Sequence, residues 1–263
     1  MTRPTKVMND QSATNVARNL FRPGYAKVVA RKLLRRIDPK ERTRSEAVAW
    51  AAQHRVAPAA WCESVDAALW AETKNFGTEL RARAKQLRDE TGQRIGGGAR
   101  AELLYFLTRH TRPEVVVETG VAAGFSSTAF LTAMQRNGTG RLLSSDFPYF
   151  RSENPEEYVG ILVPEELREN WTLLLKGDAD NLPAIIEQVD HIDLYHYDSD
   201  KTYAGRRFGM DAVASKLTAD TIVMMDDIVD NVFFRDFVTE RQAPFLVFGT
   251  GEHCVGALNL DRR

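Results

Sequence analysis

The amino-acid sequence predicts an α/β fold, with a mostly parallel sheet that follows an α-helical N-terminal extension. Helical periodicity dominates residues 45–91, whereas short apolar runs alternate with helical stretches after residue 110. That alternation is typical of βαβ units, in which consecutive strands lie parallel. With 263 residues, 43% of them hydrophobic, the chain can bury a large core without disulfides or a structural metal.

The extension is expected to cover residues 1–94, and the sheet domain is expected to cover residues 95–263. Residues 1–44 hold 12 Lys and Arg against 3 Asp and Glu, so this stretch carries +9 in a chain of net charge −1. Apolar residues at helical spacing predict a short basic helix at residues 24–37, and Pro58 opens a later helix. The basic segment could contact a membrane surface, an acidic partner or nucleic acid. A solvated arm or the contact of a homodimer is the more ordinary interpretation.

Seven apolar runs after the extension are candidate strands. The first five are separated by helical stretches and should form the parallel part of the sheet. Only residues 249–253 separate the last two runs, which is too short for a crossover and predicts an antiparallel hairpin. The expected strands are Val115–Val117, Leu142–Ser145, Trp171–Leu175, Ile192–Tyr197, Thr221–Met225, Phe245–Phe248 and Cys254–Leu260.

The composition argues against several classes of protein. Cys62 and Cys254 lack metal-ligand spacing and form no disulfide framework, which favours a reducing compartment and a cytoplasmic location. No apolar run approaches the roughly 20 residues of a membrane span, and the first residues lack the apolar core of a signal peptide. The sheet domain shows no stripe of Lys and Arg interleaved with aromatic residues, so nucleic acid is not expected as the substrate.

A glycine turn after the first expected strand carries the main functional signal. Gly120 and Gly124 would let the backbone approach a ligand closely at the carboxyl end of the strand, where open α/β sheets bind ligands. The spacing differs from the Gly-x-Gly-x-x-Gly pattern that holds a pyrophosphate, and Glu118 precedes the turn. A carboxylate there would repel a pyrophosphate and favours a cationic ligand, such as the ammonium or sulfonium group of S-adenosylmethionine.

The run from Glu118 to Ser127 resembles motif I of class I S-adenosylmethionine-dependent methyltransferases, in the form found in small-molecule O-methyltransferases. The resemblance implies a Rossmann-like, seven-stranded methyltransferase sheet, with five parallel strands and an antiparallel C-terminal hairpin. It also implies that Asp146, after the second strand, binds the ribose hydroxyls, and that the turn at Asp178 and Ala179 lies on the adenine side. The cofactor-binding residues expected on this basis are Glu118, Thr119, Gly120, Gly124, Ser126, Ser127, Asp146, Asp178 and Ala179.

Three carboxylates follow the fourth and fifth strands. Asp198 comes after the fourth, and Asp226 and Asp227 come after the fifth, so a parallel sheet would bring all three to one edge beside the cofactor. Their mutual repulsion favours a bound cation, and oxygen ligands favour a hard ion such as Mg²⁺. The sequence therefore predicts a metal site formed by Asp198, Asp226 and Asp227.

These segments are similar to two groups of O-methyltransferases. Asp198, Lys201 and Asp226 match the pattern of the divalent-cation-dependent enzymes that act on catechols and caffeoyl thioesters. Asp227 replaces the asparagine of that pattern, and Tyr203 falls one residue early. The Asp-Asp pair is more similar to the macrocin O-methyltransferase group, which methylates sugar hydroxyls. The resemblance covers roughly residues 95–260, so the first 90 residues lie outside it.

Methyl transfer to a sugar needs a base, because a sugar hydroxyl is barely ionised at neutral pH. Lys201 is the first candidate, with its ammonium pKa lowered by the cation, and an aspartate ligand, His196 or His253 is the second. A long link at residues 147–163 is expected to act as a lid at the ligand edge. The residues expected to contact the acceptor are Tyr149, Tyr203 and Asn231.

The function expected from the sequence is a Mg²⁺-dependent O-methyltransferase that transfers a methyl group from S-adenosylmethionine to a sugar hydroxyl, with Lys201 and Asp198 as its catalytic residues. A catechol or phenylpropanoid O-methyltransferase is the first alternative. An NAD-binding oxidoreductase is the second, although Glu118 and the glycine spacing argue against it. A non-catalytic scaffold is the third, and the three acids and the lysine argue against it.

Overall fold

The structure, a computed structural model, describes residues 38–92, 100–148, 155–250 and 253–260, together with residues 28, 30, 95 and 98. Most of the basic segment, including the greater part of the helix expected at residues 24–37, therefore lies outside the described residues. The same holds for Gly96, Gly97 and Tyr149. None of the helices in the described ranges is both long enough and apolar enough to cross a membrane.

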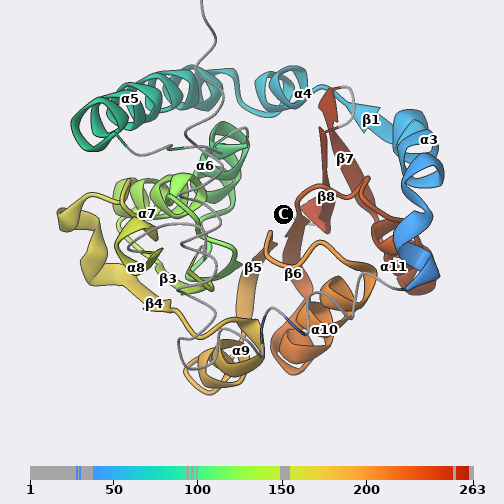
Figure 1. Cartoon of the computed structure of the whole chain (residues 1–263). Coiled ribbons are helices and arrows are strands. Elements are labelled where there is room, and N and C mark those ends of the chain that lie inside the picture. The colour runs from blue at the N-terminus through green and yellow to red at the C-terminus, as the bar shows by residue number, and fades with distance from the viewer. Residues whose placement is uncertain are drawn as a thin grey trace, which may run out of the picture.

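A single mixed sheet forms the centre of the molecule, with strand order β1-β7-β8-β6-β5-β2-β3-β4 (Figure 1). The strands β2 to β6 are mutually parallel, and β8 runs antiparallel to both β6 and β7. All seven expected strands and the C-terminal hairpin are thus confirmed. The strands of the domain are β2 (Val115–Thr119), β3 (Arg141–Ser145), β4 (Trp171–Leu174), β5 (Ile192–Tyr197), β6 (Leu217–Met225), β7 (Phe245–Thr250) and β8 (His253–Leu258).

The sheet has an eighth strand that the sequence analysis missed. Strand β1 (Arg55–Val56) comes from the N-terminal extension and pairs parallel with β7 at Val247 and Phe248. A strand of two residues is too short to show any alternation of apolar and polar side chains. The extension therefore adds the edge of the sheet in addition to its helices.

The helices begin and end where local chemistry sets their limits. Pro58 occupies the first turn of α4, and Asp66 caps α5 by accepting a hydrogen bond from the Leu69 amide at 2.9 Å. Gly92 ends α5 in the left-handed conformation. The α-helices are α3 (Arg44–His54), α4 (Pro58–Val65), α5 (Ala67–Thr91), α6 (Ala101–Thr111), α7 (Phe125–Asn137), α8 (Pro155–Tyr158), α9 (Asp178–Ile186), α10 (Tyr203–Val213) and α11 (Phe233–Arg241); the 3₁₀ helices are η1 (Pro39–Arg42), η2 (Glu165–Asn170) and η3 (Ala214–Lys216).

Helices cover both faces of the sheet, because successive side chains along each strand point to opposite faces. On β2, Val115 and Val117 pack in one core with α3, α9, α10 and α11, whereas Val116 packs in the other with α5, α6 and α7. Strand β6 shows the same division, with Val223 on the first face and Met224 on the second. Figure 1 shows α6 and α7 on the side of the sheet opposite α10 and α11. The carboxyl ends of the parallel strands remain uncovered by these helices.

Helix α5 is tied to α6 and α7 by one acidic side chain. The carboxylate of Glu72 accepts hydrogen bonds from Arg109 Nε at 2.9 Å, from Arg136 Nη1 at 3.3 Å and from the Tyr105 hydroxyl. The hydrogen bond from Arg109, helped by those from Tyr105 and Arg136, lowers the pKa of Glu72 from its ordinary value of 4.5 to about 2 despite partial burial. This contact anchors the N-terminal extension to the helix layer beside the glycine turn.

We expect Glu72→Gln to destabilise the protein at pH 7 by about 1–2 kcal/mol, because the neutral amide loses charge-assisted hydrogen bonds in a partly exposed site. The folded-state pKa lies below the ordinary value, so the contribution is complete above pH 4.5 and disappears as the pH falls toward 2. Urea unfolding of both proteins from pH 7 to pH 3.5 would measure the difference. Glu79→Gln, at an exposed position on α5, is the control and should show neither effect. A loss of stability that does not vary with pH would contradict this account.

Candidate active site

The turn after β2 brings the backbone of two strands into close contact. Gly120 has a φ of +84°, and a Cβ at this position would clash with the carbonyl oxygen of Asp198. The Thr119 carbonyl accepts a hydrogen bond from the Asp198 amide at 2.9 Å, which joins the ends of β2 and β5. Gly124 has a φ of +94°, and its Cβ would lie 2.9 Å from Gly160 Cα. Glycine at both positions therefore lets neighbouring chain segments lie against the turn.

Asp146, directly after β3, holds this turn in place. Its carboxylate accepts hydrogen bonds from the amides of Val121 at 3.1 Å, Ala122 at 2.7 Å and Phe147 at 2.6 Å. Burial raises the pKa of Asp146 to about 6, although the three amides favour its charged form. The residue expected to bind ribose hydroxyls thus lies at the turn, where its carboxylate organises the backbone.

The link at residues 147–163 was expected to close over the ligand edge, but its described part lies elsewhere. Residues 155–163 pack on the outside of the turn, with the Gly160 amide donating to the Ala122 carbonyl at 2.9 Å and the Leu162 amide donating to the Ala123 carbonyl at 3.0 Å. Because these backbone groups are paired, this part of the link supports the turn instead of closing over it.

Glu118 is buried beneath the turn, with a fully inaccessible side chain. Its carboxylate accepts hydrogen bonds from the hydroxyls of Ser127 at 2.6 Å and Ser144 at 2.8 Å, and burial raises its pKa. His196 Nδ1 lies 3.9 Å from Glu118 Oε1. The contacts of Glu118 are thus with side chains inside the fold, and the expectation that it meets a cationic ligand or a ribose stays a prediction.

Asp178 is the first residue of α9, and Ala179 follows it in the same helical turn. The Asp178 carboxylate accepts hydrogen bonds from the Ser145 hydroxyl at 2.7 Å and from the Ser199 hydroxyl. It links the segments that follow β3, β4 and β5 at the carboxyl edge of the sheet. The expected adenine-side turn is therefore at this edge, but the Asp178 side chain is engaged by the protein.

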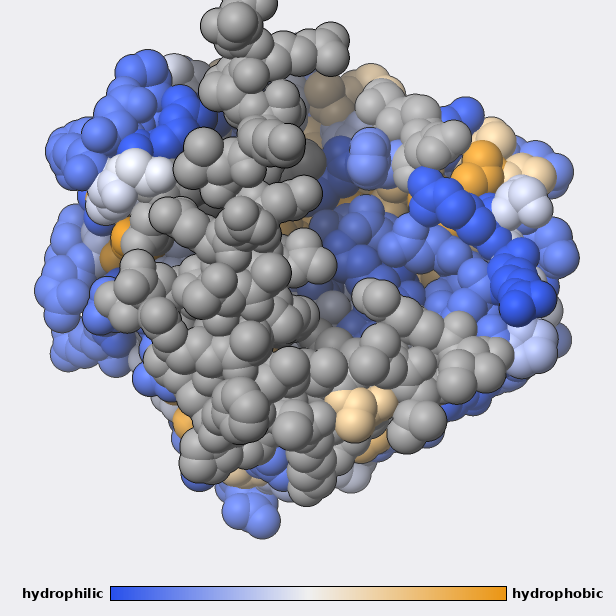
Figure 2. Space-filling view, in the orientation of Figure 1, coloured by the Kyte–Doolittle hydropathy of each residue, from blue (hydrophilic) through white to orange (hydrophobic). Residues whose placement is uncertain are grey.

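A pocket with an empty volume of about 450 Å³ opens beside the glycine turn. Figure 2 shows this face of the molecule hollowed, with hydrophilic residues around the hollow. The turn forms one wall of the pocket, the start of α6 forms another, and the ends of β5 and β6 form the third. The lining residues are Gly98, Arg100, Ala101, Leu104, Gly120, Val121, Ala122, Ala123, Phe125, Ser126, His196, Asp198 and Asp226.

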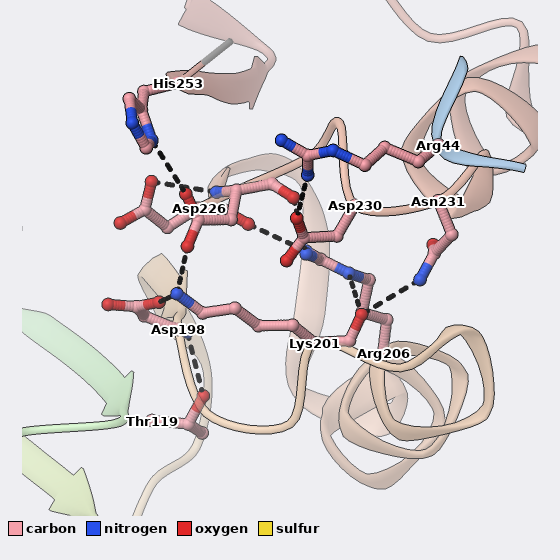
Figure 3. Close-up of polar contacts among 10 residues, drawn as sticks. Arg44, Thr119, Asp198, Lys201, Arg206, Asp226, Asp230, Asn231 and His253 are labelled. Atoms are coloured by element: carbon pink, nitrogen blue, oxygen red, sulfur yellow. Dashed lines mark hydrogen bonds and ion pairs between the residues drawn. The ribbon is translucent and has the colours of Figure 1, made fainter. Parts of the chain in front are cut away.

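The structure brings the three expected acids together. One carboxylate oxygen each from Asp198, Asp226 and Asp227 lie within 4.8 Å of one another. The ammonium of Lys201 bridges two of them, at 3.0 Å from Asp198 Oδ1 and in contact with Asp227 Oδ2 (Figure 3). His253 is 80% exposed, with Nδ1 at 3.9 Å from Asp227 Oδ1. A positive side chain thus already pairs with two of the three acids.

Burial and mutual charge control the ionisation of this cluster. Burial and the neighbouring charge of Asp226 raise the pKa of Asp198 to about 7, although Lys201 acts in the opposite direction. Burial disfavours the charge of Lys201, but Asp198 and Asp227 outweigh it and raise the pKa of the ammonium. Without a cation the lysine is therefore protonated. The lowered pKa expected from the sequence depends on a bound cation and stays a prediction.

Two of the expected acceptor residues lie away from the pocket. The hydroxyl of Tyr203 donates to Asp236 at 3.0 Å, and Lys40 Nζ lies 3.9 Å from the centre of the Tyr203 ring. Asn231 is 1% exposed, and its amide donates to the Lys201 carbonyl at 2.9 Å. These side chains make contacts inside the fold, and their assignment to the acceptor stays a prediction. Tyr149 is outside the described residues.

Sequence reasoning missed three residues at or behind the site. Arg100 lines the pocket, and the side chain of Arg206 contacts the backbone behind the carboxylates. Tyr203, Arg206 and Gly209 are three residues apart and all lie on the buried face of α10. A charged residue at a buried helical position was therefore the available signal. Glu41 of η1 accepts a hydrogen bond from the Tyr203 amide, a contact that carries no local sequence signal.

We expect Gly120→Ala to destabilise the protein by about 1–3 kcal/mol more than Gly138→Ala. Both glycines have a positive φ, +84° and +71°, so the backbone strain is matched. A Cβ at Gly120 would meet the Asp198 carbonyl, whereas a Cβ at Gly138 would meet no heavy atom within 4 Å. Urea unfolding would measure the two losses, and equal losses would show that the close approach of β2 and β5 is not a constraint.

Comparisons with known proteins agree with this arrangement. Residues 117–228 match the family model described as a methyltransferase domain. The sequence has no significant match among curated proteins. The matched range contains the glycine turn and all three carboxylates.

Solved structures with the same fold include three bacterial methyltransferases. A methyltransferase from Geobacter sulfurreducens is 18% identical and has a TM-score of 0.51, covering 69% of this chain and 90% of that chain. The O-methyltransferase TomG from Streptomyces achromogenes, in complex with SAM, is 16% identical over 68% and 89% of the two chains, with a TM-score of 0.53. An O-methyltransferase from Bacillus cereus, in complex with SAH, is 13% identical over 68% and 90%, with a TM-score of 0.50. Residues 117–228 are therefore similar to a methyltransferase domain, and the chain has the α/β fold of these methyltransferases.

Proposed function

We propose that this protein is a divalent-cation-dependent O-methyltransferase that transfers the methyl group of S-adenosylmethionine to a sugar hydroxyl. The observation that carries the proposal is the position of the carboxylates. Asp198 and Asp226 line the same pocket as the glycine turn, and Asp227 and Lys201 contact them from the side. A donor bound on the turn would then face an acceptor bound at the acids.

The glycine turn and the start of α6 provide a suitable site for the donor. Arg100 brings a positive charge to the pocket that complements the carboxylate of a methionyl group. Asp146, held against the turn, has the acceptor oxygens that ribose hydroxyls need. The neighbouring structures TomG and the Bacillus cereus enzyme are complexes with SAM and SAH, respectively, which supports the same ligand here.

The carboxylate cluster has the chemistry of a divalent-cation site. Its three oxygen donors lie close enough to share one ion, and two of them already pair with the positive charge of Lys201. A bound Mg²⁺ would supply positive charge that lowers the pKa of an acceptor hydroxyl. Asp198, Asp226 and Asp227 would hold it, and neutralising their charge would remove the cause of the raised Lys201 pKa.

The reaction is a displacement at the methyl carbon. The acceptor oxygen forms the new C–O bond while the S–C bond breaks and its electron pair stays on sulfur, which becomes a neutral thioether. The hydroxyl proton goes to a base, for which Lys201 is the first candidate because it lies among the carboxylates at the pocket. His196 lines the pocket but burial lowers its pKa, so it remains the second candidate. Holding donor and acceptor in one pocket supplies much of the rate enhancement.

The pocket wall favours a polar acceptor over a flat aromatic one. Phe125 is the only phenyl, phenol or indole ring among the lining residues that the structure describes. Phe233 and Phe234, which follow the Asp226–Asp227 pair in the chain, are 1% exposed and pack in the core. A sugar hydroxyl is therefore our first choice, and a catechol is the alternative. A homodimer and a cytoplasmic location remain predictions from the sequence.

The turn disfavours a nicotinamide dinucleotide. A dinucleotide needs free amides in the glycine turn to hold its pyrophosphate. Here the amides of Val121 and Ala122 donate to Asp146, whose negative charge would also repel a pyrophosphate. This contact argues against the oxidoreductase alternative.

We expect Asp226→Asn to lower turnover by at least about a hundredfold and to leave S-adenosylhomocysteine affinity within about twofold, because only a carboxylate at the metal cluster changes. EDTA should abolish the activity of the unmodified protein, and Mg²⁺ should restore it. Calorimetry would measure affinity, and mass spectrometry would measure methyl transfer to a sugar. Asp220→Asn, at an exposed position in the first half of the same strand, is the matched control and should behave as the unmodified protein. Full activity in EDTA would contradict the proposed metal dependence. Absence of S-adenosylhomocysteine binding would contradict S-adenosylmethionine as the donor.

We expect product analysis to find methylation in a panel of sugars and glycosides and at most weak methylation of catechol or caffeic acid. The reason is the scarcity of aromatic rings on the described pocket wall, which leaves a planar acceptor without stacking partners. Mass spectrometry of the products with labelled donor would detect transfer in both sets. Efficient methylation of catechols alone would favour the alternative acceptor.

A further inference from the structure

A buried arginine lies directly behind the carboxylate cluster. Arg206, the fourth residue of α10, is 1% exposed. Its guanidinium donates to three backbone carbonyls: Lys201 at 3.2 Å, Asp226 at 2.8 Å and Asp227 at 2.8 Å. Figure 3 shows the Arg206 side chain reaching toward this backbone, on the side away from the Lys201 ammonium.

The contacts of this cation are specific. Burying a charge is costly unless hydrogen bonds compensate for the lost water. Among the described residues, the guanidinium donates only to the three carbonyls, and each belongs to a residue whose side chain forms the cluster. If this position served only the packing of α10, an apolar side chain of similar size would be enough and no charge would be needed.

Arg206 joins two loops that the sequence separates. Lys201 follows β5, whereas Asp226 and Asp227 follow β6, so the guanidinium fixes the distance between the two strand ends. Asp227 has a φ of +48°, a left-handed conformation that is uncommon for a non-glycine residue. The hydrogen bond to its carbonyl helps to hold that conformation.

Asn231 acts on the same backbone from the other side. Its amide donates to the Lys201 carbonyl at 2.9 Å, so this carbonyl accepts two hydrogen bonds. Asn231 Nδ2 also lies 3.4 Å from Glu41 Oε2, which connects the loop to η1 of the N-terminal extension. The Lys201 backbone is therefore fixed from two directions while its side chain reaches the acids.

We propose that Arg206 is a positioning residue, which sets the geometry of Asp226, Asp227 and Lys201 for binding a divalent cation by holding their backbone carbonyls. The inference rests on the proposed function, because it assigns Arg206 a part in the metal site of that reaction. Residues that orient metal ligands from behind typically change metal affinity by about 10–100-fold when replaced.

The test compares Mn²⁺ and S-adenosylhomocysteine binding in four proteins. Electron paramagnetic resonance of free Mn²⁺ measures the affinity for Mn²⁺. Calorimetry measures the affinity for S-adenosylhomocysteine. Arg206→Met removes the hydrogen bonds and keeps much of the volume, so we expect Mn²⁺ to bind at least about tenfold more weakly and S-adenosylhomocysteine to bind within about twofold of the unmodified protein. Arg206→Lys keeps the charge but loses the planar fork and should weaken Mn²⁺ binding less.

Arg207→Met is the matched control, because Arg207 is the next residue of α10 and instead pairs with Glu240 at the surface, at 3.5 Å. It should change neither affinity. Circular dichroism would establish that each variant is folded; if Arg206→Met is not, Arg206→Lys becomes the deciding variant. Unchanged Mn²⁺ affinity in the folded variant would overturn the inference, as would an equal loss of both ligands, since that would indicate a general structural role. If the unmodified protein binds S-adenosylhomocysteine but no Mn²⁺, the proposed metal dependence fails and the inference falls with it.

Discussion

The gathering of three carboxylates at adjoining strand ends is the constraint on which the rest of the site depends. Like charges this close repel one another, so the fold must supply compensating positive charge or the acids will take up protons. Lys201 supplies it in front, where its ammonium contacts Asp198 and Asp227. Arg206 supplies it from behind, through the carbonyls of Asp226 and Asp227. One short stretch from the end of β5 to the first turn of α10 therefore carries an acid and both cations.

The same constraint connects the donor and acceptor halves of the pocket. The Thr119 carbonyl accepts from the Asp198 amide, so the glycine turn and the first acid of the cluster share a single backbone contact. Asp146 holds the other side of the turn through the amides of Val121 and Ala122. Since methyl transfer requires donor and acceptor to meet in line, fixing both halves to the same strand ends is a form of preorganisation. Rigid loops here matter as much as the identity of the side chains.

Much of the fold was predictable because its signals are local. Alternating apolar runs marked the seven strands of the domain, and the short link at residues 249–253 marked the hairpin. The position of the carboxylate cluster was predictable for a topological reason, since Asp198 and the Asp226–Asp227 pair follow parallel strands. The two-residue strand β1 was not predictable, because a stretch that short has no period. Nor was the contact of Glu41 with the Tyr203 amide, which joins segments 162 residues apart. The carbonyl partners of Arg206 were hidden as well, since a backbone acceptor has no side-chain signature.

The orientation of an acid depends on whether it lies inside a strand or just beyond its end, and this explains why Glu118 contacts the inside of the fold. Glu118 lies within β2, so the alternation of the strand directs its side chain to the Val116 face, where it contacts Ser127. Asp146, Asp198 and Asp226 each come one residue after a strand ends. Beyond the last paired residue the alternation no longer applies, and these side chains can turn toward the open edge of the sheet. In this sheet the carboxylate inside the strand therefore packs below the glycine turn, and the carboxylates just after the strands lie at the open edge.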